Sequence, residues 1–171
     1  YGKGVVFDVA AADTLKKTGS AGIGGSHRNS VLAAASFIPD GDALVQAATQ
    51  ETRITHHHSL SVAASVVVTF IIRSLIRGRQ WDETLLKEAS ELCLEKVEGN
   101  KEFTQEMSKA IHNSTKKSEG QLSRDGFAPH VVESAIHFIN QAHNFEEAIH
   151  LSCAFAGGAN YCPVLVGAMA G

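Results

Sequence analysis

An all-α fold is predicted for this chain by three features of its amino-acid sequence. Apolar residues recur at helical spacing along most of its 171 residues. Side chains that favour helix N-termini precede several of these periodic segments. The alternation that marks a half-buried strand is confined to residues 5–9. Together these features predict one all-helical domain over residues 1–171, without an internal repeat.

In the first part of the chain, a loop rich in glycine and serine precedes the first predicted helix. This loop covers residues 18–30, and a short apolar segment follows it as far as Pro39. Asp40 and Asp42 are candidate N-caps, because their carboxylates can accept hydrogen bonds from free N–H groups at a helix start. A helix is therefore predicted through residues 43–52.

A long apolar helix is predicted next, over residues 55–78. Its expected boundary residues are His58 or Ser59 at the N-terminus, Arg73 and Arg77 in the last turns, and Gly78 at the end. The uncharged run at residues 60–72 is shorter than the ~18 residues that a membrane-spanning helix needs. This segment is therefore interpreted as a buried core helix.

Five more helical segments are predicted in the second half of the chain. They are residues 81–99 behind Asp82, residues 100–118, residues 130–142 behind Pro129, residues 145–156 behind Asn144, and a last segment that begins near Pro163. Asp and Asn cap helix N-termini, and proline suits the first helical turn. Residues 116–126 form the most linker-like stretch, but they are too few to predict a domain boundary.

The charge and the cysteine content exclude several classes of partner and location. The net charge is −3 and the fifteen Lys and Arg residues are scattered, so neither nucleic acid nor a membrane is an expected partner. The first residues lack the pattern of a signal peptide. The three cysteines, Cys93, Cys153 and Cys162, show no CxxC spacing, which favours reduced thiols. A cytoplasmic protein is therefore expected.

Two local features invite a functional interpretation. The three histidines at residues 56–58 point in different directions at a helix start, so they are not expected to converge on one metal ion. The loop "GSAGIGGSHR" at residues 19–28 holds glycines that let its backbone approach a ligand, although a flexible connector has the same composition. Neither a GxSxG motif nor a P-loop is present. The glycine-rich stretch is the better candidate for a binding loop.

Three stretches together are similar to the C-terminal half of the ADP-ribosylglycohydrolase family, which has an all-helical fold. "GSAGIGGSHR" resembles the family's "GSxGNGxxMR", "ITH" at residues 54–56 resembles its "LTH", and "FAGGANYCPVLVGAMAG" at residues 155–171 resembles its "LGGDTDTIAxxxGAxAG". The last motif is the specific one. The chain also starts without methionine and stops inside an apolar helical pattern, so we expect it to be part of a larger domain.

The resemblance implies that active members use two metal ions, usually magnesium, to bind ADP-ribose and hydrolyse its N- or O-glycosidic bond. It places their ligands in an N-terminal threonine–aspartate–aspartate cluster, which has no counterpart among these residues, and in "DTDT". By position, Ala159, Tyr161 and Cys162 replace the two aspartates and the last threonine. Mg²⁺ requires oxygen ligands. We therefore expect no metal, no cofactor and no catalytic residue in this half of the site.

The resemblance also implies a ligand pocket, which is retained in part. Its expected lining residues are Gly19, Ser20, Gly22, Gly24, Gly25, Arg28, His56, Gly157 and Gly158. Ala21 and Ile23 replace an aromatic residue of some members and the asparagine of the motif. Loss of a stacking platform weakens nucleotide binding by ~1–3 kcal/mol. ADP-ribose is thus expected to bind weakly if it binds at all.

The leading hypothesis is a catalytically inactive homologue that serves as a soluble structural protein. It resembles the degenerate branch of the family that includes the jellyfish J-type lens crystallins and selenoprotein J. Two alternatives stay open: a metal-dependent hydrolase whose ligands come from an N-terminal half, and a module that binds ADP-ribose without cleaving it. Assembly into a homo-oligomer also stays open.

Overall fold

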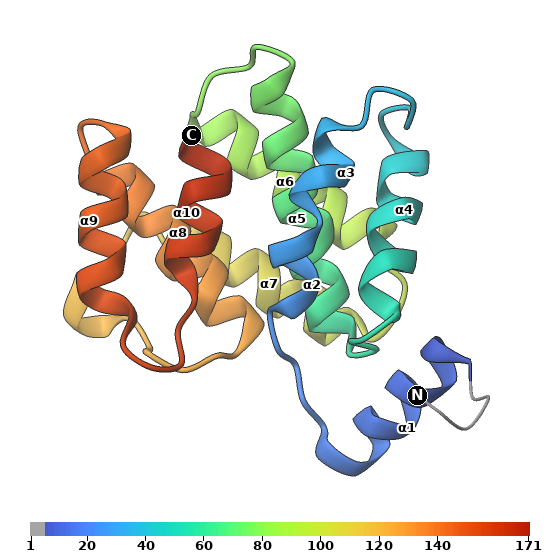
Figure 1. The fold of residues 1–171 in the computed structure, drawn as a ribbon. Coiled ribbons are helices and arrows are strands. Elements are labelled where there is room, and N and C mark those ends of the chain that lie inside the picture. The colour runs from blue at the N-terminus through green and yellow to red at the C-terminus, as the bar shows by residue number, and fades with distance from the viewer. Residues whose placement is uncertain (1–5) are drawn as a thin grey trace.

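Helix α5 (Ser59–Ile76) lies at the centre of the all-helical fold that the computed structural model shows for residues 6–171 (Figure 1). The other helices are, in chain order, α1 (Phe7–Thr18), α2 (Gly24–Arg28), α3 (Ser30–Ala34), α4 (Asp42–Arg53), α6 (Glu83–Lys96), α7 (Lys101–Asn113), α8 (Ala128–Gln141), α9 (Phe145–Ala156) and α10 (Cys162–Ala170), with a 3-10 turn η1 (Glu119–Gln121) before α8. Extended pairing within residues 6–171 is limited to one antiparallel bridge, between Gly22 and Phe127. The predicted all-α class is confirmed.

The sequence of α5 explains its central position. It is apolar on every side, and residues 62–68 are all buried. Helices α2, α3, α4, α6, α7, α8 and α10 pack around it. By length and composition alone it passes the test for a membrane span, with a mean hydropathy of 2.0, but 78% of it is buried inside the fold. This burial agrees with its interpretation as a core helix.

Several predicted helix boundaries are confirmed. The side chain of His58 accepts a hydrogen bond from the backbone N–H of Leu60 and so caps α5. Asp82 caps α6 through the N–H of Leu85, and Asn144 caps α9. Pro129 and Pro163 stand in the first turns of α8 and α10, as predicted. These boundaries follow from local chemistry.

The predicted N-caps of α4 are wrong. Gly41, with φ +75°, occupies the N-cap position, and Asp42 is the first residue of the helix. Asp40 instead accepts a hydrogen bond of 2.6 Å from Nη1 of Arg73. The N-cap position has a positive φ, which favours glycine. The carboxylate of Asp40 is hydrogen-bonded to Arg73 and therefore does not cap the helix.

Arg73 joins the C-terminal end of α5 to the turn between α3 and α4. Its side chain is 4% exposed, yet it lies within hydrogen-bond distance of four backbone carbonyl oxygens and one carboxylate. The carbonyls belong to Leu32, Ala33, Ala35 and Ile38. Leu32 and Ala33 belong to the last turn of the short helix α3, and Ala35 and Ile38 follow it, so Arg73 supplies donors at a helix C-terminus that the helix itself cannot provide. The predicted position in the last turns of α5 is confirmed.

Two other segments were left without a predicted helix or partner. Residues 7–18 form helix α1, although residues 5–9 alternate like a strand; residues 1–5 lie outside the described part of the chain. In Figure 1, α1 lies apart from the bundle formed by the other helices. The linker-like stretch at residues 116–126 is anchored, because Lys117 places Nζ 2.7 Å from Oε1 of the buried Glu133.

Candidate functional site

The predicted glycine loop, residues 19–28, is a loop only as far as Ile23, because residues 24–28 form helix α2. The whole segment, still called the glycine loop below, lies against Thr55 and His56. The imidazole of His56 packs on the backbone of the loop: a Cβ added at Gly24 would lie 2.6 Å from Cε1 of His56, and one added at Gly22 would lie 3.4 Å from its Nε2. Any side chain at position 24 would therefore displace the ring. The structure thus brings Gly22, Gly24 and His56 together, and glycine is needed here for close approach.

Arg28 ties the end of this loop to α4 and to the segment that follows it. Its Nε donates to Oε1 of Glu51 at 2.7 Å, and its Nη2 donates to Oγ1 of Thr55 at 2.8 Å. Its Nη1 donates to the carbonyl of Gly24 at 3.0 Å. Each nitrogen of the guanidinium therefore donates a hydrogen bond to another group of the protein. Arg28 was predicted from the motif, whereas Glu51 was missed, because nothing local marks it as a partner.

The other side of the glycine loop pairs with the start of α8. The N–H of Ala128 donates to the carbonyl of Ala21 at 2.9 Å, next to the bridge between Gly22 and Phe127. A Cβ added at Gly126 would lie 3.1 Å from the carbonyl oxygen of Ala159. The glycine loop and the C-terminal loop, residues 157–161, therefore flank the same segment before α8.

The remaining predicted pocket glycines serve other purposes. A Cβ at Gly25 would lie 2.6 to 2.8 Å from atoms of Thr52 and Ser65, so its small size allows α2 to pack on α4 and α5. Gly19 and Gly157 both have φ +61°, and a Cβ at either would meet nothing within 4 Å. The chain turns at these two residues. Gly158 and Ser20 are also predicted lining residues; a Cβ at Gly158 meets nothing, and Ser20 is exposed.

The three positions that carry metal ligands in the family motif offer little to a cation. Cys162 is fully buried in the first turn of α10, with Sγ 3.9 Å from the carbonyl of Ser152, and burial raises the pKa of its thiol to about 12. Tyr161 is 53% exposed and turns its ring edge toward His27, at 5.9 Å between centroids. The methyl side chain of Ala159 has no atom that can coordinate a metal ion. The residues present do not fit Mg²⁺, which requires several oxygen ligands.

No group of three or more His, Cys, Asp and Glu side chains in residues 6–171 is arranged to hold a metal ion. The three adjacent histidines illustrate why. His58 caps α5, His56 faces the glycine loop, and Nε2 of His57 is buried without a partner. Adjacent residues at a helix start point toward different neighbours, so their nitrogens do not converge.

Asn160 fixes the C-terminal loop and was not identified from the sequence. Its Nδ2 donates to the carbonyl of Ser123 at 3.0 Å and lies 3.3 Å from Oγ of Ser134. Its Oδ1 accepts from the N–H of Cys162 at 3.0 Å, which satisfies a free donor at the start of α10. An asparagine two residues before a helix start is the local signal that pointed to this role.

Burial lowers the pKa of both His27 and His56, and the nearby Arg28 lowers each of them further. Both imidazoles therefore stay neutral to lower pH than an exposed histidine. Nε2 of His27 and Oε2 of Glu51 are buried without a hydrogen-bond partner within residues 6–171. A buried polar atom of this kind can be satisfied by ordered water.

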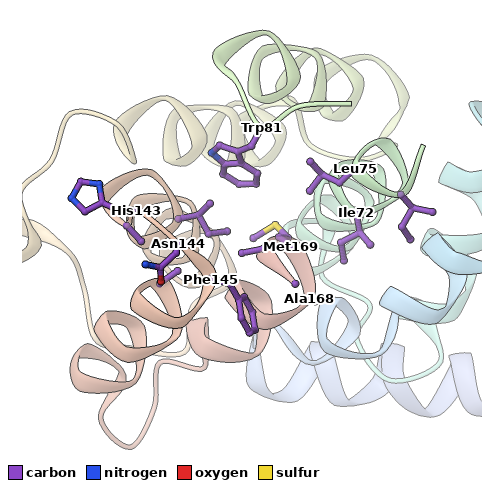
Figure 2. A pocket seen from close by; sticks show the side chains of 14 residues that line it. Ile72, Leu75, Trp81, His143, Asn144, Phe145, Ala168 and Met169 are labelled. Atoms are coloured by element: carbon purple, nitrogen blue, oxygen red, sulfur yellow. The ribbon is translucent and has the colours of Figure 1, made fainter. Parts of the chain in front are cut away.

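A separate apolar cleft lies at the far end of α10 (Figure 2). It has a volume of about 470 Å³ and is lined mainly by apolar side chains of α5, α8, α9 and α10. Trp81 closes one side, where its Nε1 donates to Oδ1 of Asn140 at 2.7 Å, and Phe145 lies on another. None of the predicted pocket residues lines this cleft.

The comparisons with known proteins agree with the sequence motifs. The family model described as ADP-ribosylglycohydrolase matches residues 3–171. Among solved structures, a chain titled "ADP-ribosylglycohydrolase-related protein complex" matches with a TM-score of 0.69 and 21% identity, over 96% of the present chain. The match covers 57% of that solved chain, so the present chain spans just over half of its length. No curated protein matches.

Proposed function

Because this chain belongs to the ADP-ribosylglycohydrolase family, we propose that it is a member whose fold persists without metal-dependent hydrolysis and serves as a soluble structural protein. One observation carries the proposal: the three ligand positions of the family motif hold a methyl group, an exposed phenol and a buried thiol. A thiol whose pKa lies at about 12 stays protonated near neutral pH and binds metal poorly.

A structural role of the crystallin kind is supported by the remaining chemistry of the chain. Cys93 and Cys162 are both fully buried, and burial raises the pKa of each thiol to about 12, which limits their oxidation. Charges of both signs are interspersed along the chain with a net value of −3, which favours solubility. A cytoplasmic location and self-association remain parts of this proposal.

Titration calorimetry with ADP-ribose, with and without Mg²⁺, tests the proposal. We expect no magnesium-dependent heat, because residues 159–162 supply no oxygen cluster for the ion. A turnover assay on an ADP-ribosylated peptide is the second arm, with a metal-dependent family hydrolase as positive control. Metal-dependent release of ADP-ribose by the whole natural polypeptide would refute the structural proposal and establish the hydrolase alternative.

A second candidate is an ADP-ribose-binding module that does not cleave its ligand. Its support is the preserved contact between the glycine loop and His56, together with the unpaired polar atoms of His27 and Glu51. This module predicts binding heat that does not depend on magnesium. It also predicts that Gly24→Ala abolishes the heat, because the new Cβ displaces His56, whereas Gly120→Ala, in open space, leaves it unchanged.

A further inference from the structure

His56 is joined to Arg28 by two hydrogen bonds that share the hydroxyl of Thr55. Nη2 of Arg28 lies 2.8 Å from Oγ1 of Thr55, and the same oxygen lies 2.8 Å from Nδ1 of His56. A guanidinium can only donate, so the hydroxyl oxygen accepts from Arg28. The hydroxyl hydrogen remains available for Nδ1, and we assign it to that nitrogen, because an N–H at Nδ1 would place a second donor on the same oxygen and leave this hydrogen without an acceptor. This order of donors fits a neutral imidazole whose proton is on Nε2.

Protonation of His56 reverses the second hydrogen bond. A protonated imidazole donates from both nitrogens, so Nδ1 directs an N–H at an oxygen that already accepts from Arg28. Two cationic donors then converge on one hydroxyl group, and the hydroxyl hydrogen loses its acceptor. Like charges this close repel each other, so the protonated arrangement is the less stable of the two.

The surroundings of His56 do not compensate this repulsion. In the described structure, the charged or titratable groups that face it are Arg28 and His27 from α2 and Glu51 from α4. Glu51 favours protonation, but its Oε1 is already paired with Nε of Arg28 at 2.7 Å. Burial and the charge of Arg28 together lower the pKa of His56.

Movement of the His56 ring acts directly on the glycine loop. The ring occupies the space that a Cβ at Gly24 would fill, and it also lies against Gly22. Arg28, the other end of the hydrogen-bond chain, donates from Nη1 to the carbonyl of Gly24 at the start of α2. The imidazole and the guanidinium thus both hold Gly24, one by packing on it and one by a hydrogen bond to its carbonyl, and a repulsion between them acts on that residue.

We propose that the hydrogen-bond chain from Arg28 through Thr55 to His56 is a pH-sensitive latch on the glycine loop. The latch is closed when His56 is neutral, and it opens locally when His56 is protonated. This inference concerns the loop itself. It therefore does not depend on whether the protein is structural, binds ADP-ribose or hydrolyses it.

Hydrogen exchange of the amides of residues 20–28, measured as protection factors at pH 7.5 and pH 5.5, tests the latch. We expect protection to fall at pH 5.5 by up to about tenfold, the limit that one histidine sets over this range. His56→Asn should abolish this fall in protection, because the side-chain oxygen of the asparagine accepts a hydrogen bond from the hydroxyl of Thr55 at either pH. His27→Asn should retain it, because Nε2 of His27 has no partner and lies outside the chain of hydrogen bonds.

Nitrogen NMR of the unmodified protein provides an independent readout that needs no variant. We expect neutral His56 to carry its proton on Nε2, with an unprotonated Nδ1. A neutral form protonated on Nδ1 would overturn the proposal, as would an equal loss of loop protection in the parent protein and in His56→Asn. Unchanged protection of residues 20–28 in the parent protein at pH 5.5 would overturn it as well.

Discussion

Arg73 shows how one buried side chain can replace several backbone hydrogen bonds. Helix α3 has only five residues, and the turn after it leaves carbonyl groups without helical partners. Arg73 donates to carbonyls before and after that turn, at 2.6 Å to Ala33 and 3.0 Å to Ile38. The turn therefore depends on a residue that follows it by more than thirty positions.

Arg73→Met should lower the free energy of unfolding by about 3 kcal/mol, because it leaves buried carbonyls without a donor and removes the 2.6 Å hydrogen bond to Asp40. Urea denaturation monitored by circular dichroism measures the change. The matched control is Arg77→Met. Arg77 is 54% exposed and 3.8 Å from Asp40, so its loss should cost less than about 1 kcal/mol. Equal losses in the two variants would contradict the role assigned to Arg73.

Gly24→Ala is expected to destabilise the protein by about 1–3 kcal/mol, because the new Cβ would lie 2.6 Å from the ring of His56. Gly120→Ala serves as the control, since a Cβ at that position meets nothing within 4 Å. Thermal unfolding of the two variants measures the difference. A fully stable Gly24→Ala protein would show that the loop does not need close contact with His56.

The candidate site could be predicted from the sequence only where its residues form a motif. Gly24, Arg28 and His56 were identified in this way, and they do come together. Glu51 was missed because its partner Arg28 is far away in the sequence. The bonds of Asn160 to Ser123 and Ser134 were missed for the same reason, although its bond to Cys162 had a local signal. Hydrogen bonds between distant segments leave no periodic or local signal.

At the scale of the helices, N-terminal caps decide where several elements begin. Asp82 and Asn144 each accept a hydrogen bond from a backbone N–H in the first turn, at 2.8 Å for Asp82 and 2.9 Å for Asn144. These bonds satisfy donors that the helix leaves free. Helix α4 begins differently, at Gly41, where no side chain caps the helix.

Asp82→Ala should cost about 1 kcal/mol of stability, the usual contribution of a capping carboxylate. Asp42→Ala should cost less than about 0.5 kcal/mol, because Asp42 is exposed and its partner Lys96 forms only a surface ion pair with it. Urea denaturation of the two variants separates these values. An equally large effect at Asp42 would reinstate that residue as the cap of α4.

The helices themselves were largely predictable, because helical period, caps and prolines are local properties. Helices α5, α6, α8 and α9 begin where their capping residues or prolines indicate. Helix α1 was not anticipated, since alternation in residues 5–9 competes with the helical preference of the residues that follow. Helices α2 and α3 were not anticipated either, because residues 18–30 have the glycine and serine content of a loop and each helix is only five residues long. The start of α4 was misplaced because a tertiary contact of Asp40 outweighed its capping preference.

At the scale of the whole molecule, stability should fall as the solution becomes acidic. The pKa values of His27, His56 and His58 are all lowered, in each case mainly by burial. The unfolded chain therefore binds more protons than the folded chain once the pH drops below about 6.5. Stability is complete above that pH and is lost as the pH falls toward the folded pKa values.

Chemical denaturation at pH 7.5, 6.5 and 5.5 checks this expectation, and a variant with all three histidines replaced by glutamine is the comparison. The parent protein should lose stability between pH 6.5 and pH 5.5, whereas the variant should lose less. If the two proteins showed parallel pH profiles, groups other than these histidines would control acid sensitivity.

Helix α5 packs against helices from both directions along the sequence. Helices α2, α3 and α4 precede it in the chain, and helices α6, α7, α8 and α10 follow it. If the polypeptide were divided in the turn around Gly78, the first piece would end with α5 and the second would begin before α6. Each piece would then expose the apolar surface that packs against the other in the intact protein. We expect the two pieces to precipitate separately and to reassemble when they are produced together, which co-purification from one cell would detect. The central helix thus makes the two halves of this fold dependent on each other.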